Sequence, residues 1–259
     1  MTSSSSSEVV QENVRIVLER VNRCYDRADP DQKAPASPRL VAVSKTKPVE
    51  LIVACYQAGQ RHFGENYVQE LVEKAKDSRI VEQCPDIKFH FIGTLQTNKA
   101  GKLLNSAGKL LDTIETVQSE KMADQLNTIC DKSARQEPLN VMIQVNTSGE
   151  AQKSGLQPEE ALDLADFIID SCPKLKLGGF MTIGALAHSL ARPDNGDGPN
   201  PDFKLLQEAR ERFCARRGIQ LTSVELSMGM SNDFEEAVLM GSTNVRVGST
   251  IFGPRLYKK

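Results

Sequence analysis

One lysine, one arginine and a few serines and glycines of this chain are placed where side chains could do chemistry on a small molecule. Lys45 follows the short apolar run 39–44 and has the same alternation as Val41 and Val43. If those valines face the inside of a barrel, Lys45 points into its mouth, where burial lowers the pKa of an amine. The uncharged amine is the form that attacks an aldehyde. Spacing alone leaves a second interpretation open, a solvated loop lysine beside Lys47.

Arg246 lies between Val245 and Val247 in another apolar run. A strand of a barrel is covered on both faces, so we expect this guanidinium to be buried. A buried arginine is either paired with an acid or bound to a ligand. Glu225 and Glu115 are the candidate acids, and the residues alone do not separate a salt bridge from a ligand contact.

Ser231, Gly248 and Ser249 are candidates for a phosphate site. They follow the seventh and eighth β-rich runs, and the loops after strands seven and eight are the recurrent phosphate site of (β/α)8 barrels. Glycine admits close approach of the backbone, and serine adds a hydroxyl donor. In the alternative interpretation, Ser231 caps a helix that begins near Asp233 and Gly248 is a turn residue.

The remaining polar candidates are an asparagine and the histidines. Asn66 ends the second run and is either a residue of the mouth or an N-cap with Gln69 in capping-box spacing. His62, His90 and His188 lack the spacing of metal ligands, so we expect core or surface roles for them and no metal site.

Short β-rich runs alternating with helical patterns must position these residues. The runs span 39–44, 62–65, 88–93, 111–115, 139–146, 175–182, 223–227 and 244–248. Eight β-then-α units predict a parallel sheet, and eight strands are the number that closes a barrel. A doubly wound open sheet is the alternative, but it would want a glycine-rich first turn, and SKTKP follows the first run instead. We therefore predict an α/β fold, a single (β/α)8 barrel of the TIM type.

Apolar periodicity predicts an extra helix ahead of the barrel, over 8–22, with valines on one face. A stripe at Val68, Leu71, Val72 and Ala75 predicts one of the helices between strands. The longest irregular stretch, Ala187–Pro201, is rich in Gly, Pro, Asn and Asp. It is either a functional loop or a solvated surface insertion.

The composition favours one globular domain. The chain has 259 residues, close to the roughly 250 typical of a (β/α)8 barrel. Its 32 basic and 34 acidic side chains leave a net charge of −2, and it has no tryptophan and 5% aromatic residues. Such a chain lacks the basic, stacking surface of a nucleic-acid binder. No apolar run reaches the roughly 18 residues of a membrane span, so we expect neither nucleic acid nor membrane as a partner.

The cysteines and the N-terminal residues indicate the cellular compartment of the protein. Six scattered cysteines without a CxxC pair are typical of reduced thiols in a cytosolic protein. Residues 1–7 are polar and Ser-rich, without the apolar region of a secretory signal or the arginines of a transit peptide. We therefore expect a cytoplasmic protein with a disordered tail over 1–7 and the barrel over 8–259.

Motifs along nearly the whole chain resemble the pyridoxal phosphate homeostasis protein family, single-domain barrels similar to the N-terminal domain of alanine racemase. The matching stretches are LVAVSKTKP (40–48), FGENYVQEL (63–71), HFIGTLQTNK (90–99), VNTSGE (145–150), FMTIG (180–184), GPNPDF (198–203), ELSMGMSNDF (225–234) and GSTNVRVGSTIFG (241–253). The resemblance implies a barrel of fold-type III that binds pyridoxal 5′-phosphate (PLP). Lys45, the first lysine of SKTK, would form a Schiff base with PLP, and Ser231, Gly248 and Ser249 would hold its phosphate.

The resemblance also implies which residues would contact the pyridine ring of the cofactor. Arg246 would face the pyridine nitrogen, and Asn66 and Met230 would line the cofactor. Arginine is always protonated, so it would donate to that nitrogen and leave PLP a poorer electron sink than an aspartate would. One departure is Thr94, where the family pattern is more variable and often contains histidine.

These implications predict a carrier of PLP with little or no turnover. Racemases that share this barrel add a β-domain and borrow a base across a dimer, and from the short run after strand eight we expect no such domain here. We expect a monomer that supplies or buffers PLP and passes it to apo-enzymes, which keeps vitamin B6 in balance. A PLP-dependent amino-acid racemase or lyase is the alternative, with Tyr67 as a weak candidate for its second base. A barrel aldolase that uses Lys45 with a phosphorylated sugar is a third.

Overall fold

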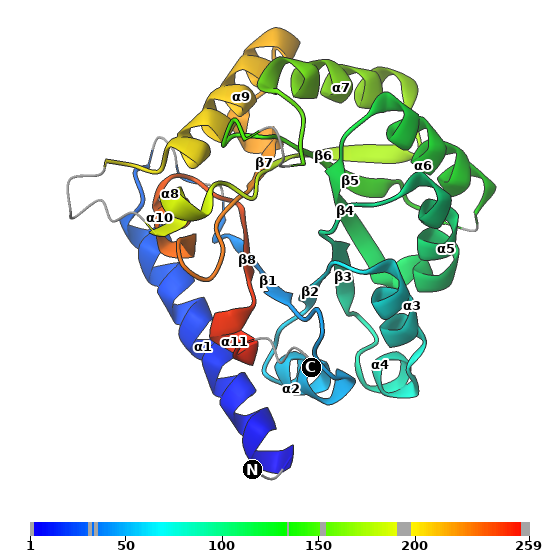
Figure 1. Cartoon of the computed structure of the whole chain (residues 1–259), viewed down its shortest axis with the longest axis vertical. Helices are drawn as coiled ribbons and strands as arrows, with labels where there is room; N and C mark the ends of the chain where they lie inside the picture. The colour runs from blue at the N-terminus through cyan, green and yellow to red at the C-terminus, as the bar shows by residue number, and fades with distance from the viewer. Residues whose placement is uncertain are drawn as a thin grey trace.

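Eight parallel strands form a closed barrel, as the sequence predicts (Figure 1). The computed structural model describes residues 3–30, 33, 36–133, 135–150, 154–190 and 198–254. The strands are β1 (Arg39–Val43), β2 (His62–Glu65), β3 (Lys88–Phe91), β4 (Leu111–Val117), β5 (Leu139–Gln144), β6 (Leu175–Met181), β7 (Glu225–Ser227) and β8 (Asn244–Val247). Each strand pairs in parallel with its neighbour in the sequence, and β1 closes the ring by pairing with β8.

Helices surround the strands, and most of them cover the outer face of the barrel, whereas α8 and α11 contribute residues to its mouth (Figure 1). They are α2 (Val49–Gln57), α3 (Val68–Lys76), α4 (Ser78–Gln83), α5 (Thr97–Ala107), α6 (Glu120–Lys132), α7 (Pro158–Ser171), α8 (Leu186–Leu190), α9 (Pro201–Arg217), α10 (Phe234–Leu239) and α11 (Ser249–Phe252). The predicted stripe of α3 is buried, because its apolar residues recur on the one helical face that packs on the barrel.

The helix ahead of the barrel, α1 (Ser3–Arg27), is longer than predicted. Its valine stripe continues to Cys24, which is also buried and extends the packed face by one turn. At its other end, residues 3–7 are helical in the structure, where we expected a disordered tail. Serine is only mildly unfavourable in a helix, so a packed helix can extend through a serine run at little cost.

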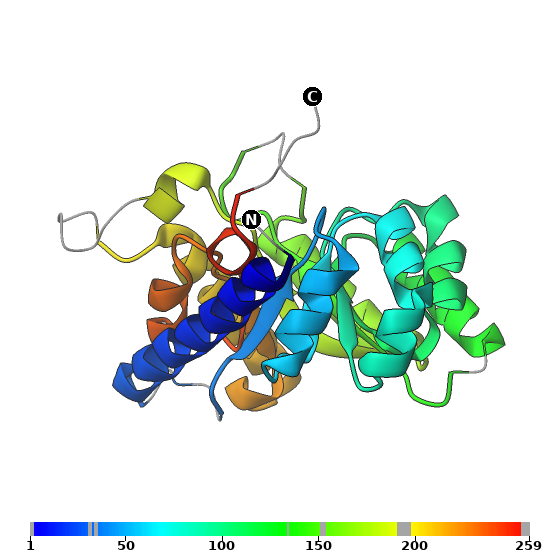
Figure 2. The same cartoon turned by 90° about the horizontal axis from the view of Figure 1, so that it is seen from below.

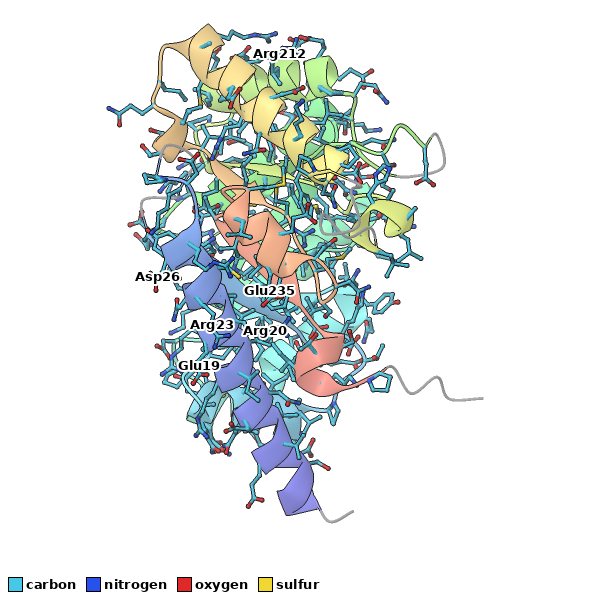
Figure 3. All side chains as sticks on the ribbon, turned by 90° about the vertical axis from the view of Figure 1, so that its left-hand side faces the viewer. Glu19, Arg20, Arg23, Asp26, Arg212 and Glu235 are labelled. Carbon is cyan, nitrogen blue, oxygen red and sulfur yellow. The ribbon has the colours of Figure 1, made fainter. Side chains whose placement is uncertain are left out.

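Helix α1 lies across the outside of the barrel rather than in the ring (Figure 2). It packs against α2, α10 and α11, so it holds the first and last α/β units together. Arg20 of α1 donates from Nε to Glu235 Oε1 and from Nη2 to Glu235 Oε2, each at 3.0 Å, and these two side chains face each other across the contact in Figure 3.

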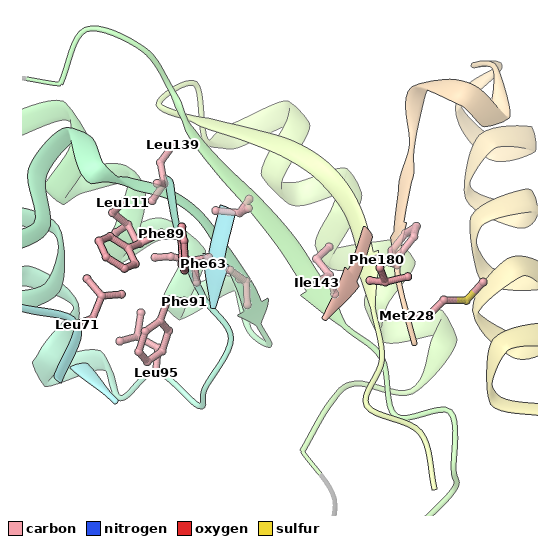
Figure 4. Close-up of a cluster of buried hydrophobic side chains, with 14 of the residues drawn as sticks. Phe63, Leu71, Phe89, Phe91, Leu95, Leu111, Leu139, Ile143, Phe180 and Met228 are labelled. Atoms are coloured by element: carbon pink, nitrogen blue, oxygen red, sulfur yellow. The ribbon is translucent and has the colours of Figure 1, made fainter. Parts of the chain in front are cut away.

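The hydrophobic core is the layer between the strands and the helices. Phe63 of β2 and Phe89 of β3 are fully buried there, with ring centroids 6.4 Å apart, and Figure 4 shows them in one layer with Leu71 of α3. Leu40 and Ala42 of β1 belong to this layer. The intervening residues of each strand therefore face the inside of the barrel, as the alternation of β1 predicts.

Three further expectations bear on the fold. All six cysteines are free and buried, as expected for reduced thiols. Among the described residues, no helix is both long and apolar enough to cross a membrane. The stretch predicted as irregular over Ala187–Pro201 begins within α8, and its residues 191–197 lie outside the described part of the chain.

Candidate functional site

A cavity of about 360 Å³ opens where the strands of the barrel end. All seven site residues predicted from the sequence line it, although they come from four different parts of the chain. These are Lys45, Asn66, Met230, Ser231, Arg246, Gly248 and Ser249. The remaining lining residues are Val43, Lys47, Ile92, Ile183, Leu186, Ser189, Asn232, Asp233 and Gly253. The mouth is thus mainly apolar on one side, with charged and hydroxyl groups gathered near the ends of β1, β7 and β8.

The alternation of β1 directs Lys45 into this mouth. Val43 lines the cavity two residues earlier, so the lysine continues the inward-facing set of the strand. The neighbouring Lys47 is engaged elsewhere, because its Nζ donates to the carbonyl oxygens of Phe252, Gly253 and Pro254 at 2.9, 3.3 and 3.0 Å. Burial lowers the pKa of Lys47. Of the two lysines, Lys45 is therefore the one that the alternation of β1 directs into the mouth.

Arg246 is paired with an acid, as one of the two interpretations expects, and it also lines the cavity. Its guanidinium is buried, Nη2 donates to the carbonyl oxygen of Thr182 at 2.6 Å, and Nη1 donates to Ser227 Oγ. The same Nη1 lies 3.8 Å from Glu115 Oε2, so Glu115 balances its charge, whereas Glu225 pairs with Arg39. Burial lowers the pKa of Arg246, but an arginine remains protonated at any physiological pH.

Glu115 is the centre of a polar network inside the barrel, below Arg246. It accepts hydrogen bonds from Ser227 Oγ at 2.6 Å and from Asn244 Nδ2 at 3.1 Å, and its Oε1 lies 2.6 Å from His90 Nδ1. An ionised carboxylate only accepts, so Nδ1 of His90 carries a proton. Burial alone would raise the pKa of Glu115, but the hydrogen bond from His90 and the charges of His90 and Arg246 hold it at about 2. A fixed negative charge therefore sits beneath the arginine.

Ser231, Gly248 and Ser249 form a small group of backbone N–H and hydroxyl donors beside β8, which we call the cradle. The backbone N–H of Gly248 donates to Ser231 Oγ at 3.2 Å, which joins the turns after β7 and β8. A side chain at position 248 would have its Cβ 3.3 Å from Val43 Cβ, so the close approach favours glycine. Ser249 opens α11, and the first N–H groups of a helix have no partner within it. The cradle can therefore present several donors to an anion.

The capping alternative for Ser231 is wrong. Asp233 is the residue that precedes α10, and its Oδ1 accepts the backbone N–H of Met230 at 2.6 Å, so it orders the turn that holds Met230 and Ser231. The hydroxyl of Ser231 instead joins the neighbouring turn at Gly248.

The capping alternative for Asn66 is wrong too. Tyr67 occupies the N-cap of α3, and it makes no capping hydrogen bond with its side chain. Asn66 Oδ1 is buried and has no hydrogen-bond partner within the described residues. Gly93 packs so closely on the Asn66 backbone that a Cβ at position 93 would lie 2.0 Å from its carbonyl oxygen. The asparagine is therefore fixed in place with an acceptor left for a ligand.

A second, smaller cavity of about 180 Å³ adjoins the first. Asn66, Ile92 and Ile183 line both cavities. The second is otherwise lined by residues such as Asn146 and Thr182, the last residues of the predicted runs 139–146 and 175–182. A ligand larger than the first cavity would extend in this direction.

The structure also brings together two histidines that their spacing in the sequence did not connect. His62 Nδ1 lies 2.9 Å from His90 Nε2, and these atoms and an Asp112 oxygen all lie within 4.8 Å of one another. Such a group has the ligand types of a metal centre. The two histidines already bond to each other, His90 also bonds to Glu115, and Lys88 Nζ lies 3.6 Å from Asp112. We therefore interpret the cluster as a continuation of the Glu115 network. Burial holds the pKa of His62 at about 3.

Sequence reasoning named Glu115 only as one possible partner for Arg246 and did not find Ser227 or Asn244 as members of a network. A signal was present, because Glu115 ends the predicted run 111–115, which the structure extends to Val117 as β4, and Arg246 stands inside the run 244–248. A charged residue in the middle of one buried strand requires an opposite charge in another.

Comparisons with known proteins agree with this architecture. The model of the family described as alanine racemase, N-terminal domain, matches residues 28–255. The pyridoxal phosphate homeostasis protein of Mus musculus is 50% identical over 246 residues, covering 95% of this chain and 87% of that protein. A solved structure of an unknown protein from Bifidobacterium adolescentis is 33% identical, with a TM-score of 0.80 over 97% of this chain and 98% of that one. PipY of Synechococcus elongatus, solved with PLP bound, is 30% identical, with a TM-score of 0.68 over 92% and 100% of the two chains.

Proposed function

Because the chain belongs to the pyridoxal phosphate homeostasis protein family, with a barrel of the alanine racemase N-terminal type, we propose that it binds PLP as a Schiff base on Lys45 and supplies or buffers this cofactor. The observation that carries the proposal is the convergence of Lys45, Arg246 and the Ser231–Gly248 cradle in one cavity. An amine for the aldehyde, a partner for the ring nitrogen and donors for the phosphate are the three groups that hold this cofactor.

The residues of the cavity fit PLP. The buried Asn66 Oδ1 lacks a partner in the described structure, and a buried acceptor without a donor is costly unless a ligand supplies one. Gly248 leaves space next to Val43 that a side chain would fill. Ser231 and Ser249 add hydroxyls at the same end of the cavity, so the phosphate would lie there. Met230 and Asn66 would flank the ring.

Arg246 argues for weak catalysis by the bound cofactor. PLP supplies an electron sink when its ring nitrogen is protonated. A permanent guanidinium cation, held by Ser227, Thr182 and Glu115, donates a hydrogen bond but no proton. Since the Glu115 charge stabilises this cation further, the arginine would keep the ring nitrogen unprotonated.

A racemase or lyase also needs a second base that faces Lys45. Besides Lys45 and Arg246, Lys47 and Asp233 are the titratable groups among the described residues of the cavity lining, and both are engaged by backbone groups. Tyr67, the weak candidate, is 54% exposed and is not among those lining residues. This arrangement favours a carrier over an enzyme, and we propose little or no turnover of amino acids.

We further propose that the protein works in the cytoplasm as a monomer and passes PLP to apo-enzymes. Six free, buried cysteines support a reducing compartment. Binding as an imine keeps a reactive aldehyde from other amines while allowing exchange, which is the behaviour that a buffer of vitamin B6 requires.

The visible absorbance spectrum of the protein loaded with PLP tests this function. Wild type should gain an absorbance band in the visible range that sodium borohydride removes, because borohydride reduces the imine. Lys45→Ala should lack the band, whereas Lys76→Ala, which removes an exposed lysine of α3, should keep it. Rapid exchange of the α-hydrogen of an amino acid by the loaded wild type would favour the racemase or lyase instead.

A further inference from the structure

The turn that carries Lys45 has an unfavourable backbone conformation. Thr46, the next residue, has φ = +62° and is the one non-glycine residue with positive φ among the described residues. A β-branched side chain makes this left-handed conformation especially unfavourable. Such a conformation persists only where surrounding contacts over-determine it, and in folded proteins it clusters at functional sites.

Two side chains of α3 hold the backbone on both sides of Lys45. Glu70 Oε1 accepts the backbone N–H of Thr46 at 2.6 Å. Lys74 Nζ donates to the carbonyl oxygen of Ser44 at 2.8 Å and to Glu70 Oε1 at 2.7 Å. The residue before Lys45 and the residue after it are therefore tied to one ion pair.

Lys74 is unusual because it is 5% exposed and yet takes no part in the cavity lining. Its third contact is Glu65 Oε1 at 2.7 Å, and the same oxygen accepts Ser44 Oγ at 2.6 Å. Three acceptors match the three donors of an ammonium group, so its direction is fixed. A lysine is almost never buried unless it is paired, and these acceptors converge on the turn of Lys45.

We propose that Glu70 and Lys74 are positioning residues, which hold the Ser44–Thr46 turn in its left-handed conformation and so aim Lys45 at the bound aldehyde. This inference rests on the proposed function and adds to it the part of the fold that pre-organises the amine. Without Glu70, Thr46 would relax to negative φ and Lys45 would swing away from the phosphate cradle. The ligand would then have to select a minor conformation of the turn, which lowers its apparent affinity.

The test compares variants of Glu70, whose side chain is partly exposed and whose removal leaves Lys74 in contact with Glu65. Glu70→Ala should weaken PLP binding about tenfold and slow the appearance of the imine absorbance band. Glu70→Gln keeps an acceptor for the Thr46 N–H and should recover most of the affinity. Glu73→Ala, an exposed glutamate of the same helix, is the matched control and should bind PLP as wild type does.

A double variant separates positioning from general loss of structure. Thr46→Gly removes the cost of positive φ, so the turn depends less on Glu70. Glu70→Ala should therefore reduce PLP affinity less in the Thr46→Gly background than in wild type. Equal PLP affinity and equal imine formation in Glu70→Ala and wild type, with circular dichroism showing both folded, would overturn the proposal. A wild type that fails to bind PLP at all would instead refute the proposed function, so the two failures are distinct.

Discussion

Replacing Glu115 by glutamine should destabilise the barrel more than almost any other isosteric change. The carboxylate is completely buried and is bonded to His90, Ser227 and Asn244, with Arg246 Nη1 at 3.8 Å. Glutamine keeps the shape but loses the charge, so the buried cation of Arg246 loses its main counter-charge. Its amide also adds two donors where the neighbouring groups are already donating.

Two ways of estimating the loss of stability in Glu115→Gln give about the same value. Breaking a buried ion pair by removing one partner costs roughly 3–5 kcal/mol. The depression of the Glu115 pKa from 4.5 to about 2, at about 1.36 kcal/mol per unit, corresponds to roughly 3 kcal/mol. We therefore expect a loss of about 3 kcal/mol at pH 7, or roughly 6–12 °C in the unfolding midpoint at about 2–4 °C per kcal/mol.

Urea unfolding of the protein without PLP, followed by circular dichroism, measures this difference. Glu82→Gln, an exposed glutamate of α4, is the control and should change the free energy of unfolding by less than about 0.5 kcal/mol. Because the folded pKa is depressed, the stabilisation by Glu115 is present above pH 4.5 and is lost as the pH falls towards 2. The difference in the free energy of unfolding between wild type and Glu115→Gln should therefore decrease as the pH falls from 4.5 towards 2. A Glu115→Gln variant within about 1 kcal/mol of wild type at pH 7 would refute the electrostatic account of the network.

Three further outcomes follow from the cavity and its support. Gly248→Ala should weaken binding of both PLP and inorganic phosphate several-fold in titration calorimetry, because its Cβ would crowd Val43 at 3.3 Å; unchanged affinity would place the phosphate elsewhere. Asn66→Ala should lower PLP affinity while leaving the ligand-free protein as stable as wild type or up to about 1 kcal/mol more stable, since it removes an unsatisfied buried acceptor; a large loss of stability without ligand would contradict this. Burial raises the pKa of Glu65 to about 7, so its contribution to stability should fall as the pH rises from 4.5 to 7. The free energy of unfolding of wild type, measured against Glu65→Gln, should decline by up to about 3 kcal/mol over that window, and a flat difference would show that Glu65 is ionised throughout.

The barrel and the site lining were predictable because both depend on local pattern. Short β-rich runs between helical patterns mark the strands, and the strand count then indicates closure. Once the strands are placed, their C-terminal ends must meet, so Lys45, Ser231 and Gly248 could be assigned to one mouth before their contacts were known. Arg246 was found by the same logic, as a charge inside a buried strand.

What the sequence did not reveal depends on contacts between distant elements. The contacts of Glu70 and Lys74 with the Ser44–Thr46 turn depend on the register of β1 on β2 and on the rotation of α3 about its axis. Neither of these is encoded in a local sequence pattern. His62 and His90 meet only because adjacent strands place them side by side. The capping alternatives for Ser231 and Asn66 are wrong for a related reason, since both residues lie in plausible cap sequences but the N-caps of α10 and α3 are two residues and one residue later. Helix ends are set by tertiary packing as much as by propensity.

Mapping the modified lysine tests the central claim most directly. The wild-type protein is incubated with PLP, reduced with borohydride and digested, and its peptides are sequenced by tandem mass spectrometry. The account predicts a stable phosphopyridoxyl group on Lys45, at near-stoichiometric yield, and none above background on the neighbouring Lys47. A folded protein that carries the group on another lysine, or carries none, would contradict it.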